Sequence, residues 1–201
     1  MQVPPPAPRE RLGPAPGGRS AGRWRWLVGA VDRLYVWASR TRPIPASRGA
    51  LMVSFHRHRG PALDLPAGPP VRPGDLVCEI HLWNRRIARR EGSDAQGVTW
   101  GVIRDFRADL SALAGAMQAG TLPQAPVYAA SALSEAAPRF GFWVRPLPPG
   151  LRRVALGAWQ HLVRRAFRPE ALGTEHLRVA GESWMSAPEL LRRYGRPSRS
   201  G

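Results

Sequence analysis

The chain has 201 residues, enough for one domain with a proper core and too few for a second of useful size. Its formal net charge is +16 and all 30 basic residues are arginine, so its charge would attract nucleic acid, anionic lipid or acidic polymers. A single cysteine excludes an internal disulfide and a zinc site built from cysteines, and no apolar run approaches the ~18 residues of a membrane span. We therefore expect a cytoplasmic protein.

The N-terminal part divides into a polar tail and a predicted helix. Residues 1–22 are rich in proline, glycine and arginine and nearly devoid of apolar side chains, which predicts a disordered basic tail. Residues 23–40 carry apolar side chains at helical spacing until Pro43 stops the pattern. Such a stripe is typical of a helix packed on its own domain. Because Trp26 and Trp37 lie off the stripe, peripheral contact of this helix with an anionic membrane is the alternative.

Two candidate strands follow, joined by a loop rich in proline and glycine. Residues 50–58 and 75–83 both alternate between apolar and polar side chains, as half-buried strands do. Strands connected in this way are often neighbours in a sheet. Their polar faces carry histidine, glutamate and tryptophan side chains: His56 and His58 on the first, and Glu79, His81 and Trp83 on the second.

An arginine run comes next, with four arginines in six residues: Arg85, Arg86, Arg89 and Arg90. Paired guanidinium donors can hold phosphate groups, which makes this run a candidate anion-binding site. No glycine-rich or aromatic cradle accompanies it, so a solvated surface is the favoured interpretation. A capping-box pattern at residues 93–96 then predicts a long helix that ends near Gln118, before Gly120.

The remaining segments complete an α+β pattern. Three more strands are predicted at residues 126–131, 140–145 and 177–185, with a second long helix at 151–167 and a short one at 186–195. These elements predict a single domain over residues 23–196, followed by a basic tail at 197–201. We expect a mainly antiparallel sheet of about five short strands, two long helices on one face, and the N-terminal helix.

Metal chemistry depends on how the two early strands pair. In a suitable register, histidine and carboxylate side chains of a kind that suits zinc or iron come within reach of one another: His56, His58, Glu79 and His81. The favoured interpretation is simpler and needs no cofactor, with Glu79 and His81 forming a structural hydrogen-bonding pair. A nucleophilic enzyme is not indicated, because Cys78 falls in the apolar row of its strand and no Gly-x-Ser-x-Gly elbow occurs.

Several stretches resemble one bacterial domain family. The most distinctive is Gly74-Asp75 leading into Glu79-Ile80-His81-Leu82 and Asn84, and others are Val31-Asp32-Arg33-Leu34-Tyr35, Arg139-Phe140-Gly141-Phe142 and Glu182-Ser183-Trp184-Met185-Ser186. They are similar to the YkoP-like domain, found alone or C-terminal to polysaccharide deacetylases. The resemblance implies a link with envelope polysaccharide metabolism. It transfers no metal ligand or catalytic residue, because the chain contains no deacetylase domain.

The expected function is that of a non-enzymatic or accessory domain, associated with a partner protein, an envelope polymer or the membrane surface. Its candidate ligand-binding residues are Glu79, His81, Trp83 and Asn84. One alternative is a metal-dependent enzyme or metal-binding protein that uses the four residues proposed above as zinc or iron ligands. Another is a nucleic-acid-binding protein that acts through its basic surface.

Overall fold

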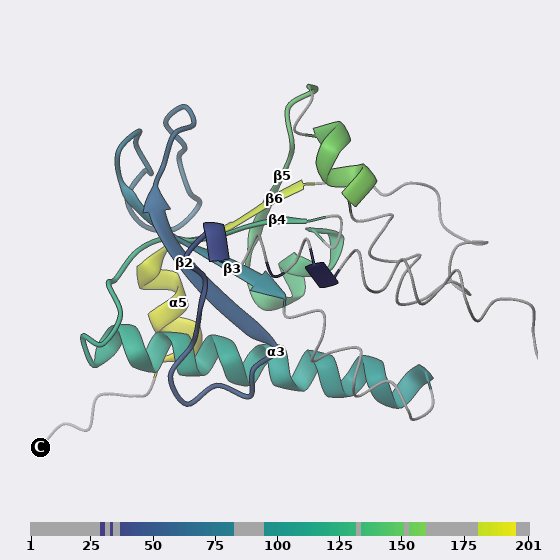
Figure 1. Cartoon of the computed structure of the whole chain (residues 1–201). Coiled ribbons are helices and arrows are strands. Elements are labelled where there is room, and N and C mark those ends of the chain that lie inside the picture. The colour runs from purple at the N-terminus through teal and green to yellow at the C-terminus, as the bar shows by residue number, and fades with distance from the viewer. Residues whose placement is uncertain are drawn as a thin grey trace, which may run out of the picture.

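The computed structural model describes residues 29–30, 33, 37–82, 95–131, 134–150, 153–159 and 181–195. A six-stranded sheet lies over one long helix, α3 (Ala95–Gln118), as Figure 1 shows. The strands are β1 (Arg42–Pro43), β2 (Leu51–Arg57), β3 (Leu76–Leu82), β4 (Val127–Ser131), β5 (Trp143–Pro146) and β6 (Gly181–Met185). The predicted α+β class and the mostly antiparallel sheet are confirmed, with one strand more than expected.

The order of the strands is β1-β2-β3-β4-β6-β5, and one of the pairings is parallel. β3 pairs with β4 in parallel because α3 carries the chain back to the starting end of the sheet between them. The other pairs are antiparallel. The unpredicted strand, β1, has only two residues and lies at an edge, where Pro43 is tolerated because an edge position does not need every backbone N–H.

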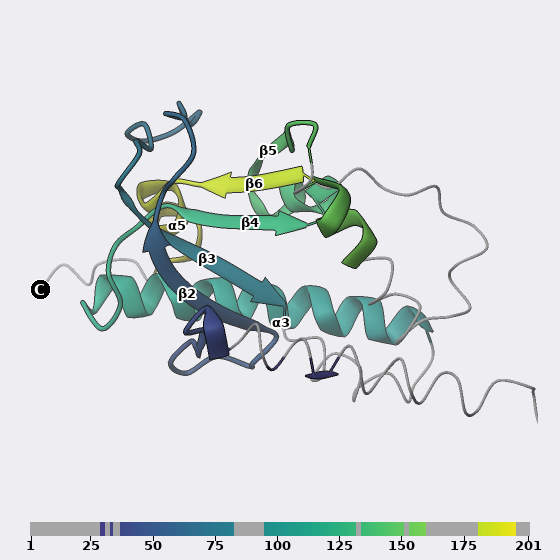
Figure 2. The same ribbon diagram turned by 45° about the horizontal axis from the view of Figure 1, so that its top comes forward.

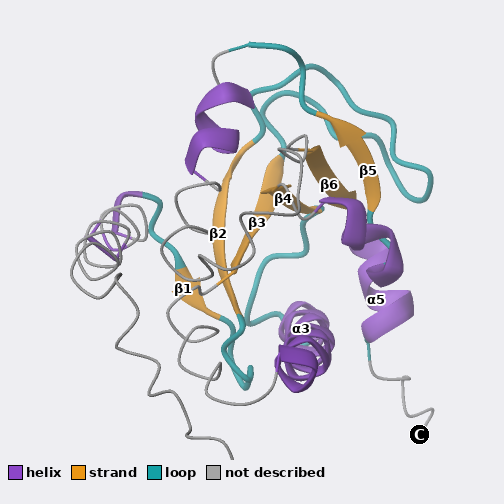
Figure 3. Cartoon of the chain, turned by 90° about the vertical axis from the view of Figure 1, so that its right-hand side faces the viewer, coloured by secondary structure: helices purple, strands orange, loops and turns teal. Residues whose placement is uncertain are grey.

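The helical elements lie at different places around the sheet. α3 packs against the short α5 (Ala187–Tyr194), and both lie on the same side of the sheet in Figure 3. A 3-10 helix, η1 (Ser134–Phe140), precedes β5. The described part of the second predicted long helix, residues 153–159, lies near the end of the sheet where β4 ends and β6 begins (Figures 1 and 2). Within the predicted N-terminal helix, the described residues 29–30, 33 and 37–38 are helical.

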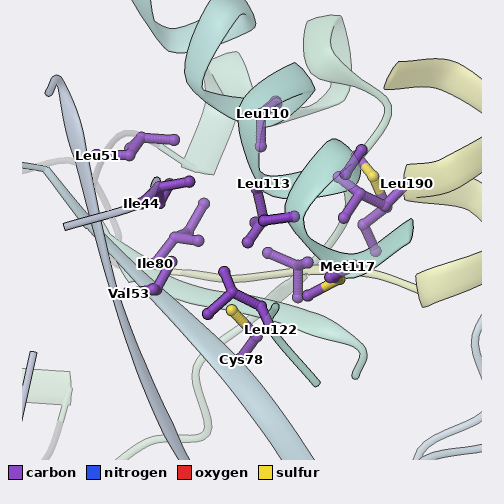
Figure 4. Packing of buried hydrophobic residues seen from close by; sticks show 14 of the residues in the cluster. Ile44, Leu51, Val53, Cys78, Ile80, Leu110, Leu113, Met117, Leu122 and Leu190 are labelled. Atoms are coloured by element: carbon purple, nitrogen blue, oxygen red, sulfur yellow. The ribbon is translucent and has the colours of Figure 1, made fainter. Parts of the chain in front are cut away.

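The main core fills the space between the sheet and α3, as the close-up in Figure 4 shows. Alternate residues of β2 and β3 point toward the helix, which presents side chains spaced three to four residues apart. The fully buried members from the helix include Leu110, Leu113 and Met117, and those from the two strands include Leu51, Val53 and Cys78. This packing fixes which face of each strand is turned away from α3.

A buried carboxylate attaches α3 to the start of β2. Asp109 is fully buried, and its side-chain oxygens accept hydrogen bonds from the backbone N–H groups of Arg48, Ala50 and Leu51. The last two of these bonds measure 2.7 and 2.8 Å. A buried carboxylate is tolerated where several donors satisfy it, so Asp109 sets the position at which β2 crosses the helix.

The face of the sheet opposite α3 is covered in part by the loop between β2 and β3. Leu63, Leu65 and Val71 of this loop pack on apolar side chains of β3, β4 and β6, which are Val77, Tyr128 and Trp184. The loop closes on itself through paired backbone hydrogen bonds between Leu63 and Val71. In the part of the chain that the structure describes, no helix is both long and apolar enough to cross a bilayer.

Candidate functional site

The two early strands are direct neighbours, as the sequence predicted, and they run antiparallel (Figure 2). In their register Ser54 lies opposite Glu79, and Met52 lies opposite His81. Because alternate residues of a strand share a face, Ser54 and His56 of β2 lie on the same face as Glu79 and His81 of β3. This is the face turned away from α3.

Glu79 is the centre of a polar group on that face. Its Oε2 atom lies 3.2 Å from Nε2 of His56 and 3.9 Å from Nε2 of His81. The side chains of Glu79 and His81 are 18% and 17% exposed, and that of His56 is 43% exposed. Ser54 completes the contact set through a 3.0 Å hydrogen bond between its Oγ and Nε2 of His81. We call Ser54, His56, Glu79 and His81 the Glu79 group.

Each ring nitrogen of His56 has a polar partner. Its Nδ1 lies 3.1 Å from the carbonyl oxygen of Arg57, which can only accept, so Nδ1 carries a hydrogen. Its Nε2 faces the carboxylate of Glu79. When the ring is protonated, Nε2 can donate to this carboxylate and the contact becomes an ion pair. The arrangement therefore suits an ion pair that is partly open to water.

His81 lies in a different environment. Burial lowers the pKa of His81, the charge of Glu79 raises it, and the charge of His56 lowers it. Its Nε2 is the atom approached by both Ser54 and Glu79. A catalytic triad places the hydroxyl and the acid on opposite nitrogens of the histidine, so these three residues do not form one. Ser54 is also buried, which leaves its hydroxyl a structural partner of His81.

His58 is separate from the other three residues suggested as metal ligands. β2 ends at Arg57, and His58 turns under the following loop, where its Nε2 lies 2.9 Å from the carbonyl oxygen of Pro61. Its ring packs edge-on against Trp184, with ring centres 5.5 Å apart. Among the residues that the structure describes, no group of three histidine, cysteine or carboxylate side chains is placed to hold a metal ion.

Other side chains on this face of the sheet were not proposed as site residues from the sequence. Tyr128 on β4 is opposite Glu79 in the parallel register, and its ring meets that of His56 edge-on at 6.4 Å. On β5 and β6, Arg145 and the buried Glu182 form a 2.7 Å ion pair on the same face. The sequence placed all three in predicted strands, but their partners depend on pairings between distant segments.

Cys78 is part of the core, as its place in the apolar row predicted. It is fully buried, and burial raises the pKa of its thiol to about 12. The charge of Arg42 opposes this effect and the charge of Glu79 adds to it. A thiol that stays protonated near neutral pH is a poor nucleophile and a poor metal ligand.

Six predicted site residues lie outside the described residues: Trp83, Asn84, Arg85, Arg86, Arg89 and Arg90. The ligand-binding role of the first two and the anion-binding role of the four arginines therefore stay predictions. Glu79 and His81 are the predicted ligand-binding residues that the structure places, and it brings them together with Ser54 and His56.

A family model described as the YkoP domain matches residues 22–194. The chain belongs to the YkoP domain family. The resemblance seen in the sequence is thereby confirmed, and the match extends from before the first described residue to Tyr194, the last residue of α5. No curated protein and no solved structure matches the chain. The YkoP domain of this chain thus includes the whole sheet, with the Glu79 group on one of its faces.

Proposed function

We propose that this YkoP domain is a non-enzymatic accessory domain that binds an envelope polysaccharide through the Glu79 group. The observation that carries the proposal is the position of Glu79 between His56 and His81 on the face turned away from α3. These three side chains are held by one another and by Ser54, and each keeps part of its surface exposed. Groups fixed in this way lose little rotamer freedom when a ligand arrives.

The chemistry of the group favours a ligand rich in hydroxyl and amide groups. An ionised carboxylate only accepts hydrogen bonds, whereas imidazole rings donate or accept according to their protonation. Together they offer both kinds of hydrogen-bonding partner over a short distance, which matches a sugar chain. The sequence resemblance, which implies a link with polysaccharide deacetylases, is the reason for choosing an envelope glycan over other polar ligands.

A binding role fits the described side chains better than catalysis. Ser54, His81 and Glu79 depart from the triad arrangement, and the one cysteine is buried with a strongly raised pKa. The ring of His58 is engaged elsewhere, which removes one of the four suggested metal ligands. A group that fixes donors and acceptors without an activated nucleophile is suited to recognition.

The test is the affinity of the full chain for the neutral hexamer of N-acetylglucosamine, measured by isothermal titration calorimetry. The Glu79→Gln variant keeps the shape of the side chain and removes its charge, and we expect it to bind about tenfold more weakly because a charged hydrogen-bond partner is lost. Asp64→Asn, at an exposed position in the β2–β3 loop, removes the same charge and serves as the control. Equal affinities of Glu79→Gln and wild type, or no binding by wild type, would overturn the proposal.

A further inference from the structure

Exposed arginines gather where α5 meets η1, on the side of the sheet that α3 covers. They come from three segments far apart in the sequence: Arg107 on α3, Arg139 on η1, and Arg192 and Arg193 on α5. α3 and α5 pack together, and Figures 1 and 3 both show them side by side. We call these four residues the arginine cluster. It lies on the opposite face of the sheet from the Glu79 group.

Phe140 and Tyr194 form the centre of the cluster. The hydroxyl of Tyr194 donates a 2.9 Å hydrogen bond to the carbonyl oxygen of Phe140, which joins α5 to η1. The guanidinium carbon of Arg107 lies 5.8 Å from the centre of the Phe140 ring. Burial raises the pKa of Tyr194, while the charges of Arg107 and Arg193 lower it. Arg107 and Arg193 are therefore both close enough to act on the same hydroxyl.

The charge of the cluster is only partly balanced. Glu189 accepts hydrogen bonds from Arg192, at 2.8 and 2.7 Å, and from Arg193. These two arginines hold the pKa of Glu189 at about 2, so it stays ionised near neutral pH. The guanidinium groups of Arg107 and Arg193 thus act on one hydroxyl, and Arg192 shares the Glu189 carboxylate with Arg193. Arg139 is exposed and directly precedes Phe140 in the chain. The excess positive charge is available to an anionic partner.

The arginines are restrained by packing. A Cβ atom on Gly141 would lie 2.6 Å from Nε of Arg193, so the absence of a side chain there leaves room for this arginine. Arg193 is also bound to Glu189, and Arg107 lies over an aromatic ring. A guanidinium that is already positioned loses less freedom on binding than one on a free side chain. Binding an anion should therefore cost the cluster less side-chain entropy than it would cost a set of freely moving surface arginines.

The surroundings of the cluster select the kind of anion. The exposed large apolar side chains among the described residues are Trp37, Trp143 and Val154, and all three lie on other elements. The Phe140 ring contacts Phe106 on α3, at 4.5 Å between ring centres, as well as Arg107. The described part of the cluster therefore offers no apolar anchor for a bilayer and no open aromatic face on which bases could stack. Charge and hydrogen bonding remain, and these suit an acidic sugar chain.

We propose that the arginine cluster binds an acidic polysaccharide, with its guanidinium groups paired to carboxylate or phosphate groups along the chain. The cluster would be a second binding surface, and its ligand would carry negative charge. This inference rests on the proposed function for one point, which is that the ligand is a polysaccharide. Arg107 and Arg139 are the members with exposed side chains and no carboxylate partner among the described contacts. They carry the largest part of the expected binding.

The test compares two double variants of the full chain that lose the same charge. Arg107→Gln/Arg139→Gln alters the cluster, whereas Arg59→Gln/Arg72→Gln alters two exposed positions in the β2–β3 loop. Binding to polygalacturonate is measured by calorimetry at low and moderate salt, with circular dichroism to show that each variant is folded. We expect the cluster variant to bind about tenfold more weakly and the loop variant to change by less than about twofold.

Three results would overturn the proposal. Equal losses of affinity in the two double variants would show that binding depends on net charge and not on the cluster. If uncharged dextran bound as tightly as polygalacturonate, the acidic groups of the ligand would have no role. Tighter binding of a random DNA duplex with the same dependence on Arg107 and Arg139 would assign the cluster to nucleic acid. Binding of the neutral N-acetylglucosamine hexamer, and its loss in Glu79→Gln, should be unchanged by the arginine variants, so the two surfaces are tested separately.

Discussion

Glu79 reaches diagonally across the sheet to His56, placing its Oε2 atom 3.2 Å from Nε2 of a residue that is not opposite it. The residue directly opposite is Ser54, which bonds in turn to His81. Two diagonal contacts therefore interlock across the same pair of strands. Diagonal neighbours are within reach of long side chains, and here they tie the site to the pairing of β2 with β3. A shift of one residue in that pairing would dismantle the site.

The pH dependence of stability should report the burial of His81. Burial lowers the pKa of His81 from its ordinary value of 6.5, so between the two values the unfolded chain binds more protons than the folded one. The contribution of His81 is fully present above pH 6.5 and is lost as the pH falls through the folded-state value. Urea unfolding of wild type and His81→Gln from about pH 8 to about pH 5 should show a steeper loss of stability in wild type. Parallel curves would contradict this assignment.

The thiol of Cys78 should be unreactive in the folded protein. Its pKa is raised to about 12 by burial, and the side chain has no exposed surface. At about pH 8 we expect negligible reaction with Ellman's reagent until urea unfolds the chain, after which one thiol per chain should react. Rapid labelling of the folded protein would show that the core between α3 and the sheet opens.

Among the acidic residues of the described core, Asp109 should cause the largest loss of folding stability when it is replaced. Replacing it with asparagine leaves one accepting oxygen for three backbone N–H groups, so Asp109→Asn should lower the free energy of unfolding by about 2 to 3 kcal/mol. Asp64→Asn, at an exposed loop position, is the matched control and should change it by less than about 0.5 kcal/mol. Denaturant titration distinguishes them. Equal effects would mean that Asp109 does not hold β2 on α3.

Alanine variants of Gly141 and Gly74 separate two effects, which are backbone strain and displacement of the Arg193 side chain. Both have positive φ, 85° and 92°, so alanine at either should lower the free energy of unfolding by about 1 kcal/mol. A Cβ on Gly74 meets nothing within 4 Å, whereas one on Gly141 meets Arg193. Gly141→Ala should therefore also weaken polygalacturonate binding, and Gly74→Ala should not. Identical binding by the two variants would show that Arg193 has no part in the arginine cluster.

Short-range patterns predicted the central strands and the main helix well. Residues 78–82 alternate between apolar and polar side chains, and the structure forms β3 over Leu76–Leu82 with Cys78 turned to the core. The capping-box pattern and Gly120 predicted a long helix that ends near Gln118, and α3 ends at Gln118. These features depend on the spacing of neighbouring residues, which the sequence contains directly.

Features that depend on distant segments could not be predicted in this way. His58 follows the last residue of β2 and its backbone pairs with Gly74 and Asp75, but its ring lies against Trp184 and Pro61 and not beside Glu79. Asp109 lies beside apolar residues in the sequence, which is a signal of a buried carboxylate. Its partners, the backbone N–H groups of Ala50 and Leu51, lie about 60 residues earlier, and only the fold brings them to it. The parallel pairing of β3 with β4 likewise depends on how α3 crosses the sheet.

The most direct test of the proposed ligand contact is an NMR titration of the histidine Hε1 resonances with the N-acetylglucosamine hexamer. His56 and His81 belong to the Glu79 group, whereas His58 is engaged with Pro61 and Trp184 and serves as an internal reference. We predict that the signals of His56 and His81 shift in a saturable manner and that the signal of His58 stays in place. Saturable binding that leaves His56 and His81 unmoved would contradict the account.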